Sequence, residues 1–98
     1  MFVHHVFFWL NEPDNQEAYN TQAEGLRQLS TISNIKMVHV GKPASTKRDV
    51  IDGSYTFSLL TVFDSEADHD SYQEDPIHLK FIADCKPLWK KVLVYDSE

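Results

Sequence analysis

Residues 1–10 have the sequence MFVHHVFFWL, and this stretch decides the fold. Between Met1 and the turn-forming residues Asn11-Glu12-Pro13-Asp14, almost every side chain is β-branched or aromatic, which is typical of a β-strand. Alternate side chains of a strand point to opposite faces. One face would carry Val3, His5, Phe7 and Trp9, and the other Phe2, His4, Val6, Phe8 and Leu10. Both faces are apolar, so each needs a partner to bury it.

The composition indicates a single soluble domain. The chain has 98 residues and a net charge of -6, and this acidic balance argues against nucleic acid or an anionic membrane as the main partner. No apolar run approaches the length of a membrane span, and the N-terminus lacks the pattern of a signal peptide. The lone Cys85 excludes an intrachain disulfide and lies in an apolar stretch. We therefore expect a cytoplasmic protein with a buried thiol.

The rest of the chain carries alternating helix and strand signals. Asp14 or Asn15 can cap a helix that runs to about Leu29 with apolar residues at helical spacing. Asp75 can cap a later helix with Pro76 at its first position. The other expected elements are strands at residues 35–40, 54–63 and 89–96, a loop at 42–53, and helices at 66–74 and from 76 to about 85. The order β-α-β-β-α-β predicts an α+β, ferredoxin-like fold, with a four-stranded antiparallel sheet and its helices on one face.

The face of the sheet away from the helices is also apolar. All four expected strands carry apolar side chains on both faces, and no further segment of this chain remains to cover the second one. Several hundred Å² of exposed apolar surface is more than a soluble monomer normally tolerates. We predict a symmetric homodimer whose two sheets pack face to face into a barrel.

The second half of the chain carries a recognisable signature. It consists of Phe63-Asp64-Ser65, the stretch YQEDPIHLKF at residues 72–81 and the stretch KPLWKKVLVYD at residues 86–96. Together with His5 in the first strand, this resembles the stress-responsive A/B barrel (Dabb) family of dimeric α+β barrel proteins. The resemblance covers nearly the whole chain, so it implies one domain over residues 1–98 and dimerisation through the open sheet face.

The resemblance also implies a site. Plant polyketide cyclases related to olivetolic acid cyclase are similar, and they perform an intramolecular aldol condensation without a cofactor, in a pocket between sheet and helices. Their histidine base and its tyrosine partner match His78 and Tyr72, while His5 and Trp89 match a pocket histidine and a pocket aromatic. The sequence departs from them at Phe57, where the cyclases have another histidine. It also has Thr21, Gln22 and Gly25 at positions of helix aromatics, so their substrate is not implied.

The residues themselves also favour a site at His78 and Tyr72. His78 falls near the third position of a helix, where the helix dipole disfavours a protonated imidazole. A neutral histidine beside the Tyr72 hydroxyl could remove a proton next to a carbonyl. The alternative is a buried histidine whose polar atoms are satisfied by Tyr72 or by backbone. Pockets are mostly lined by apolar and aromatic side chains. The expected lining is Phe7, Trp9, Phe57, Leu59, Phe81 and Trp89.

Two functions follow as hypotheses. The first is a small enzyme of the aldol, cyclase or lyase type, with His78 as base, Tyr72 as partner and His5 orienting an apolar or aromatic carbonyl compound. The second is a non-catalytic protein of the stress response, which binds a small ligand or has a structural role. A cofactor-independent monooxygenase rests on shared fold alone. We expect no cofactor and no metal site, because His39 and His69 lack ligand spacing to another metal-binding side chain. His4 is expected on the dimer side.

Overall fold

A four-stranded antiparallel sheet organises the chain, and the computed structural model describes every residue from Met1 to Glu98. In chain order the elements are β1 (Phe2–Leu10), α1 (Gln16–Leu29), β2 (Met37–Gly41), β3 (Phe57–Phe63), α2 (Glu66–Glu74), α3 (Pro76–Cys85), the short 3-10 turn η1 (Lys86–Leu88) and β4 (Trp89–Ser97). The strand order is β2-β3-β1-β4, so β1 is central and pairs with β3 and β4. The predicted ferredoxin-like α+β fold is confirmed.

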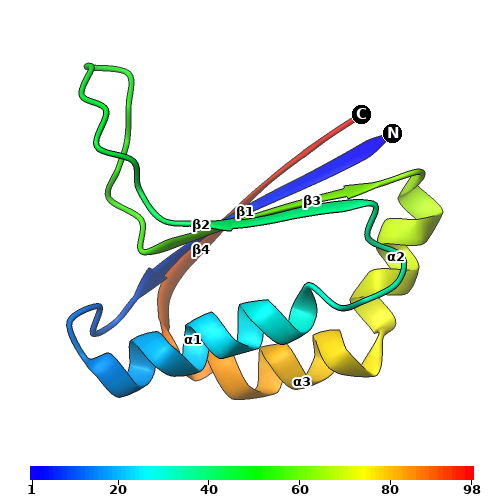
Figure 1. The fold of residues 1–98 in the computed structure, drawn as a ribbon, viewed down its shortest axis with the longest axis horizontal. Helices are drawn as coiled ribbons and strands as arrows, with labels where there is room; N and C mark the ends of the chain where they lie inside the picture. The colour runs from blue at the N-terminus through cyan, green and yellow to red at the C-terminus, as the bar shows by residue number, and fades with distance from the viewer.

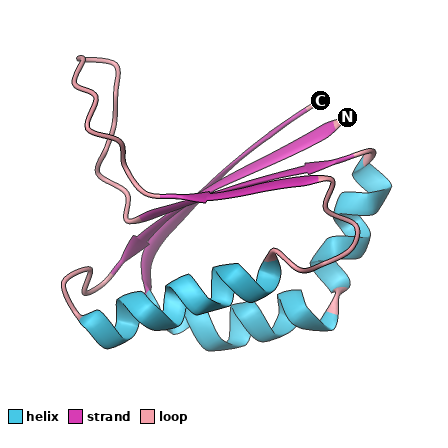
Figure 2. Ribbon diagram, in the orientation of Figure 1, coloured by secondary structure: helices cyan, strands magenta, loops and turns pink.

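All three helices lie on one side of the sheet. Helices α1 and α3 run side by side beneath it, and α2 descends from the end of β3 to the start of α3 (Figures 1 and 2). The connection between β2 and β3 projects away on the opposite side (Figure 1). None of the helices combines the length and apolar character that crossing a membrane requires.

Side-chain caps set where the helices begin. The Asn15 side chain accepts a hydrogen bond from the Ala18 N–H, and Ser65 accepts one from Asp68. Asp75 caps α3 by accepting from the Ile77 N–H, with Pro76 in the first turn. These caps satisfy N–H groups that a helix leaves without partners. The predicted break at Asp75-Pro76 is confirmed, and it sets α2 and α3 at an angle (Figure 1).

The middle strands are shorter than predicted. β3 begins at Phe57 rather than residue 54, because the Ser54 N–H bonds the Asp52 side chain in a local turn instead of joining the sheet. β2 begins at Met37 rather than residue 35, since Ile35 still closes a turn with Ile32. Residues 42–56 contain no helix or strand. After α3 the chain makes the turn η1 around Pro87 before entering β4.

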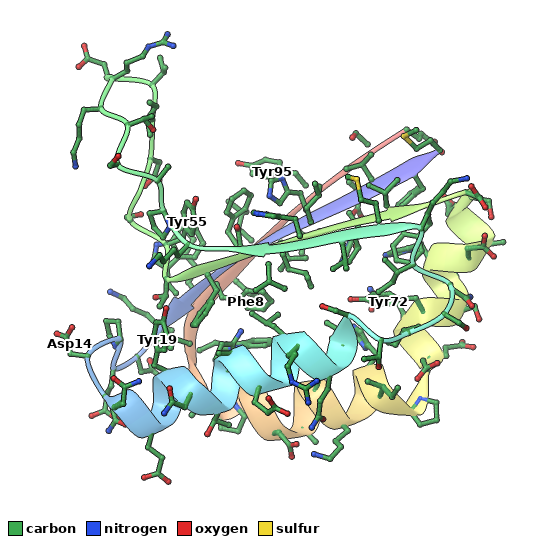
Figure 3. The ribbon with its side chains drawn as sticks, viewed as in Figure 1. Phe8, Asp14, Tyr19, Tyr55, Tyr72 and Tyr95 are labelled. Carbon is green, nitrogen blue, oxygen red and sulfur yellow. The ribbon has the colours of Figure 1, made fainter.

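The core lies between the sheet and the helices, and it contains the even-numbered residues of β1. Phe2, Val6, Phe8 and Leu10 are at most 7% exposed, whereas the odd-numbered residues between them are only half-buried. Figure 3 shows Phe8 and Tyr72 on the helix side of the sheet and Tyr55 and Tyr95 on the other side. Cys85 is fully buried, as predicted, and burial raises the pKa of its thiol to about 11.

Candidate functional site

A cavity of about 240 Å³ lies between the sheet and the helices. Most of the residues that line it are apolar, and two histidines, a tyrosine and a glutamine supply polar groups. Such a combination is typical of sites for small organic ligands. The lining consists of His4, Val6, Phe8, Leu29, Leu59, Tyr72, Gln73, His78, Phe81, Ile82, Trp89, Val92 and Val94.

His78 supplies a basic nitrogen to this cavity. It lies in the first turn of α3, two residues after Pro76, and is 8% exposed. Its Nδ1 atom is buried and has no hydrogen-bond partner. Burial lowers the pKa of His78, and the nearby imidazoles of His4 and His69 act in the same direction, while Asp75 and the Gln73 backbone oppose the shift. The ring is therefore neutral near pH 7 and keeps a lone pair for a proton or a ligand.

Tyr72 lies beside His78 at the end of α2. The two rings meet edge-on with their centroids 4.9 Å apart, and Tyr72 is 1% exposed. Burial raises the pKa of the Tyr72 phenol. The hydroxyl consequently stays protonated, so it can donate a hydrogen bond to a ligand oxygen but cannot serve as a base. The predicted pairing of Tyr72 with His78 is thus confirmed as a contact.

The histidine of β1 that lines the cavity is His4 and not His5. His4 is 7% exposed, and its Nδ1 lies 2.6 Å from Asp96 Oδ1 on the neighbouring strand β4. Burial lowers the pKa of His4, while the Asp96 carboxylate opposes this shift. His69 of α2 contacts His4 with the two rings tilted and their centroids 4.6 Å apart. Three imidazoles, those of His4, His69 and His78, therefore surround Tyr72.

His5 lies on the open face of the sheet, so the prediction that it lines the same pocket as His78 is wrong. The strand register is the physical reason: β1 pairs Val6 with Leu59 and with Val94, which brings the even-numbered residues of β1 to the helix side. Directly paired residues of antiparallel strands share a face. His5 instead contacts Phe7 on the open face, with the ring centroids 4.4 Å apart.

The other predicted lining residues divide in the same way. Leu59, Phe81 and Trp89 line the cavity, as expected. Phe57 is buried but packs on Tyr19 in the core, outside the cavity lining. Phe7 and Trp9 belong to the open face, where they line a separate hollow of about 130 Å³. Both are odd-numbered residues of β1, as His5 is, so the same strand register places them on the open face.

Gln22 is a polar residue of the core that the sequence analysis did not single out as a site residue. It is fully buried on α1, and its Oε1 accepts a hydrogen bond of 2.7 Å from the Trp89 indole. This bond holds the Trp89 side chain where it lines the cavity. The spacing could have identified Gln22, because it lies three residues after Tyr19 and four before Leu26, on the buried stripe of the helix.

A larger groove between α1 and α3 is a weaker candidate. Its volume is about 580 Å³, but no hydrophobic residue lines it. Its walls carry the polar side chains of residues such as Glu17, Asn20 and Lys80. Such a surface remains hydrated, and it lacks the apolar walls and buried titrating groups that mark a reactive site.

Solved structures show the same fold. A Dabb family protein of Mesorhizobium loti matches with a TM-score of 0.79 and 23% identity over 99% of this chain and 94% of its own. A dimeric ferredoxin-like protein of unknown function from Thermobifida fusca matches with a TM-score of 0.78 and 20% identity over 98% and 88%. The hydroxynitrile lyase of Passiflora edulis matches with a TM-score of 0.78 and 22% identity over 98% and 90%.

The sequence comparisons give the family. Among curated proteins, no sequence matches this chain. The family model described as the stress responsive A/B barrel domain matches residues 2–98, which is nearly the whole chain. The protein therefore belongs to the stress-responsive A/B barrel (Dabb) family.

Proposed function

We propose that this protein catalyses an acid–base reaction on a small apolar or aromatic carbonyl compound, of the aldol, cyclase or lyase type. The observation that carries the proposal is the imidazole of His78 on the wall of an apolar cavity, in edge-on contact with Tyr72. Burial lowers the pKa of this imidazole, which favours its neutral, basic form.

The two side chains have complementary roles in such a step. The neutral His78 imidazole accepts a proton from the carbon next to a carbonyl, or from a hydroxyl in the lyase direction. The protonated Tyr72 donates a hydrogen bond to the oxygen on which negative charge develops. In the aldol direction the enolate carbon forms a bond to a second carbonyl carbon, and the resulting alkoxide recovers the proton from His78. In cleavage of a hydroxy compound, His78 removes the hydroxyl proton and the carbon–carbon bond breaks to leave a carbonyl compound. The departing carbon, which is an enolate for a β-hydroxyketone and cyanide for a hydroxynitrile, takes the proton back from His78.

The size and lining of the cavity restrict the substrate. About 240 Å³ is below the usual 300–1,000 Å³ of ligand pockets, so the proposed substrate is small. The hydroxynitrile lyase with the same fold supports the lyase variant of the proposal. Gln22, buried behind Trp89, makes this wall of the core more polar than the aromatic wall of the polyketide cyclases.

We also propose that the protein is a homodimer through the open face of the sheet. Aromatic side chains cover this face, including Phe7, Trp9 and Tyr95, and no element of the chain packs on them. A structural neighbour from Thermobifida fusca is described as dimeric. A cytoplasmic location and a role in stress response stay predictions.

The competing hypothesis is that the cavity binds a ligand without chemistry. The two can be separated by incubating the wild type with a small aromatic hydroxynitrile or β-hydroxyketone and measuring aldehyde or ketone release. We expect turnover, and a loss of about 100- to 10,000-fold in His78→Gln, the range in which general base catalysis contributes. Tyr72→Phe should lower turnover less, since only one hydrogen-bond donor is removed.

A control variant and a measurement of the melting temperature distinguish catalysis from binding without chemistry. His39→Gln removes an exposed histidine of β2 outside the cavity and should leave turnover unchanged. If these compounds raise the melting temperature of the wild type but are not converted, the cavity is a binding site and the enzymatic proposal fails. If they are converted equally by wild type and His78→Gln, His78 is not the base.

A further inference from the structure

Three potential metal ligands from distant parts of the sequence meet at one end of the cavity. They are His4 of β1, His69 of α2 and Asp96 of β4, and one ligand atom of each lies within 4.8 Å of the others. We propose that His4, His69 and Asp96 form a binding site for a divalent transition-metal ion of the zinc class. This goes beyond the proposed function, which uses the side chains of His78 and Tyr72.

The distances allow the three groups to converge on one ion. His4 Nδ1 and Asp96 Oδ1 are already 2.6 Å apart, and the His4 and His69 rings are in contact. Ligand atoms around a tetrahedral zinc ion are about 3.4 Å apart, because each lies about 2.0–2.1 Å from the metal. Binding would lengthen the His4–Asp96 separation and shorten any separation near the 4.8 Å limit, through side-chain rotations. Asp96 can make such a movement, since its side chain is 43% exposed near the end of β4.

The chemistry of the donors favours this class of ion. Two imidazoles and one carboxylate are the ligands of many catalytic zinc and non-haem iron sites, which leave further positions for water. Calcium and magnesium prefer oxygen ligands, so the two imidazoles select against them. The single carboxylate, that of Asp96, would offset part of the charge of the ion.

The surroundings of His69 resemble a second coordination shell. Asp70 Oδ1 lies 3.2 Å from His69 Nδ1, and the Gln73 amide lies 3.3 Å from His69 Nε2. Carboxylates that accept a hydrogen bond from one ring nitrogen commonly orient metal-binding imidazoles, so that the other nitrogen can bind the metal. In His69 that other nitrogen is Nε2, and the Gln73 amide would have to turn away from it when an ion binds. The ring is also packed against Phe2, with the centroids 4.6 Å apart. His69 is therefore held in place rather than free in solvent.

Zinc binding to the full-length protein tests the site. We expect isothermal titration to give one Zn²⁺ per chain, and Co²⁺ to give the visible absorption of a site with imidazole ligands. His69→Gln and Asp96→Asn should each weaken Zn²⁺ binding by more than tenfold. His39→Gln, which removes an exposed histidine outside the cluster, should leave binding unchanged. Asp96→Asn keeps the shape of the side chain at a half-exposed position, so it remains informative if His69→Gln fails to fold.

Two results would overturn the proposal. One is the absence of stoichiometric Zn²⁺ binding by the wild type. The other is binding that survives both His69→Gln and Asp96→Asn. If that binding is lost in His39→Gln, the ion is held on the open face, where His5 and His39 flank Leu60. His78→Gln should retain Zn²⁺ binding, so a failure of the metal site and a failure of the acid–base proposal give different results.

Discussion

At the scale of single residues, the neighbours His4 and His5 have opposite environments. His4 lies against Tyr72 and Asp96 on the helix side, while His5 stacks on Phe7 on the open face. A strand directs successive side chains to opposite faces, so one of the pair had to enter the cavity side. Which one does so depends on the parity that pairing with β3 imposes.

The buried histidines predict how stability depends on pH. Burial lowers the pKa of both His4 and His78 below 6.5 in the folded state, so the unfolded chain binds more protons in acid. Stability is therefore fully present above pH 6.5 and falls as the pH drops below that value. Urea unfolding at fixed protein concentration, between pH 7.5 and 5, should show this decline.

His78→Gln provides the comparison. Glutamine does not titrate, so the variant should lose less stability between pH 7.5 and 5 than the wild type does. Equal pH dependence in both proteins would show that His78 has the same pKa in the folded and unfolded chains. That result would also remove the physical basis for a neutral base in the cavity at acidic pH.

At the scale of elements, the break between α2 and α3 builds the site. Tyr72 lies in the last turn of α2 and His78 in the first turn of α3, with the Asp75 cap and Pro76 between them. A continuous helix would rotate these two side chains away from each other, because six residues correspond to about 600° of rotation at 3.6 residues per turn. The turn signal at Asp75-Pro76 thus brings Tyr72 and His78 together.

The contact between α1 and α3 gives a prediction at the same scale. A Cβ atom at Gly25 would lie 2.7 Å from Cys85 Sγ and 3.0 Å from Phe81 Cδ1. Gly25→Ala gains about 1 kcal/mol of helix propensity, but overpacking of a buried contact costs about 1–3 kcal/mol. We expect a net loss of about 1 kcal/mol in the free energy of unfolding, measured in urea.

Removing the Cys85 sulfur tests whether its close contact causes the expected loss of stability in Gly25→Ala. In a Cys85→Ala background, Gly25→Ala should be less destabilising than in the wild type, because the 2.7 Å contact no longer exists. If Gly25→Ala stabilises the wild type, helix propensity outweighs packing and the close approach of the two helices does not depend on glycine.

At the scale of the whole molecule, one face of the sheet is left without a covering layer. One face of the sheet is covered by the helices, while the other carries rings such as Phe7, Tyr55 and Tyr95 in mutual contact. The segment at residues 42–56 rises on this same side (Figure 1). A second copy would bury the rings, and the segment is placed to flank it.

Light scattering measures the mass of the protein in solution and so tests the proposed dimer. At micromolar concentration the wild type should have twice the chain mass of 11.3 kDa. Phe7→Glu should give a monomer, because it places a charge in the middle of the apolar face. Leu79→Glu changes a 58% exposed residue of α3 on the helix side and should remain dimeric. A monomeric wild type, or an unchanged mass for Phe7→Glu, contradicts the proposed interface.

Much of the architecture could be predicted from local sequence signals. Three features depend only on neighbouring residues: the apolar run of β1, the cap at Asn15 and the break at Asp75-Pro76. Their positions can therefore be predicted from the sequence. The contact of Tyr72 with His78 follows from the same break. The predicted starts of β2 and β3 lie two or three residues before the observed ones, because turn hydrogen bonds of Ile35 and Ser54 replace sheet pairing there.

Short-range patterns and composition are enough to predict the order of elements, the family and the apolar character of both sheet faces. The entry of His4 into the cavity, and its meeting with His69 and Asp96, become visible only in the folded chain. Those outcomes depend on the register between strands far apart in the chain, and a shift of one residue exchanges the two faces. Because β1 is apolar on both faces, its sequence contains no signal that could distinguish them.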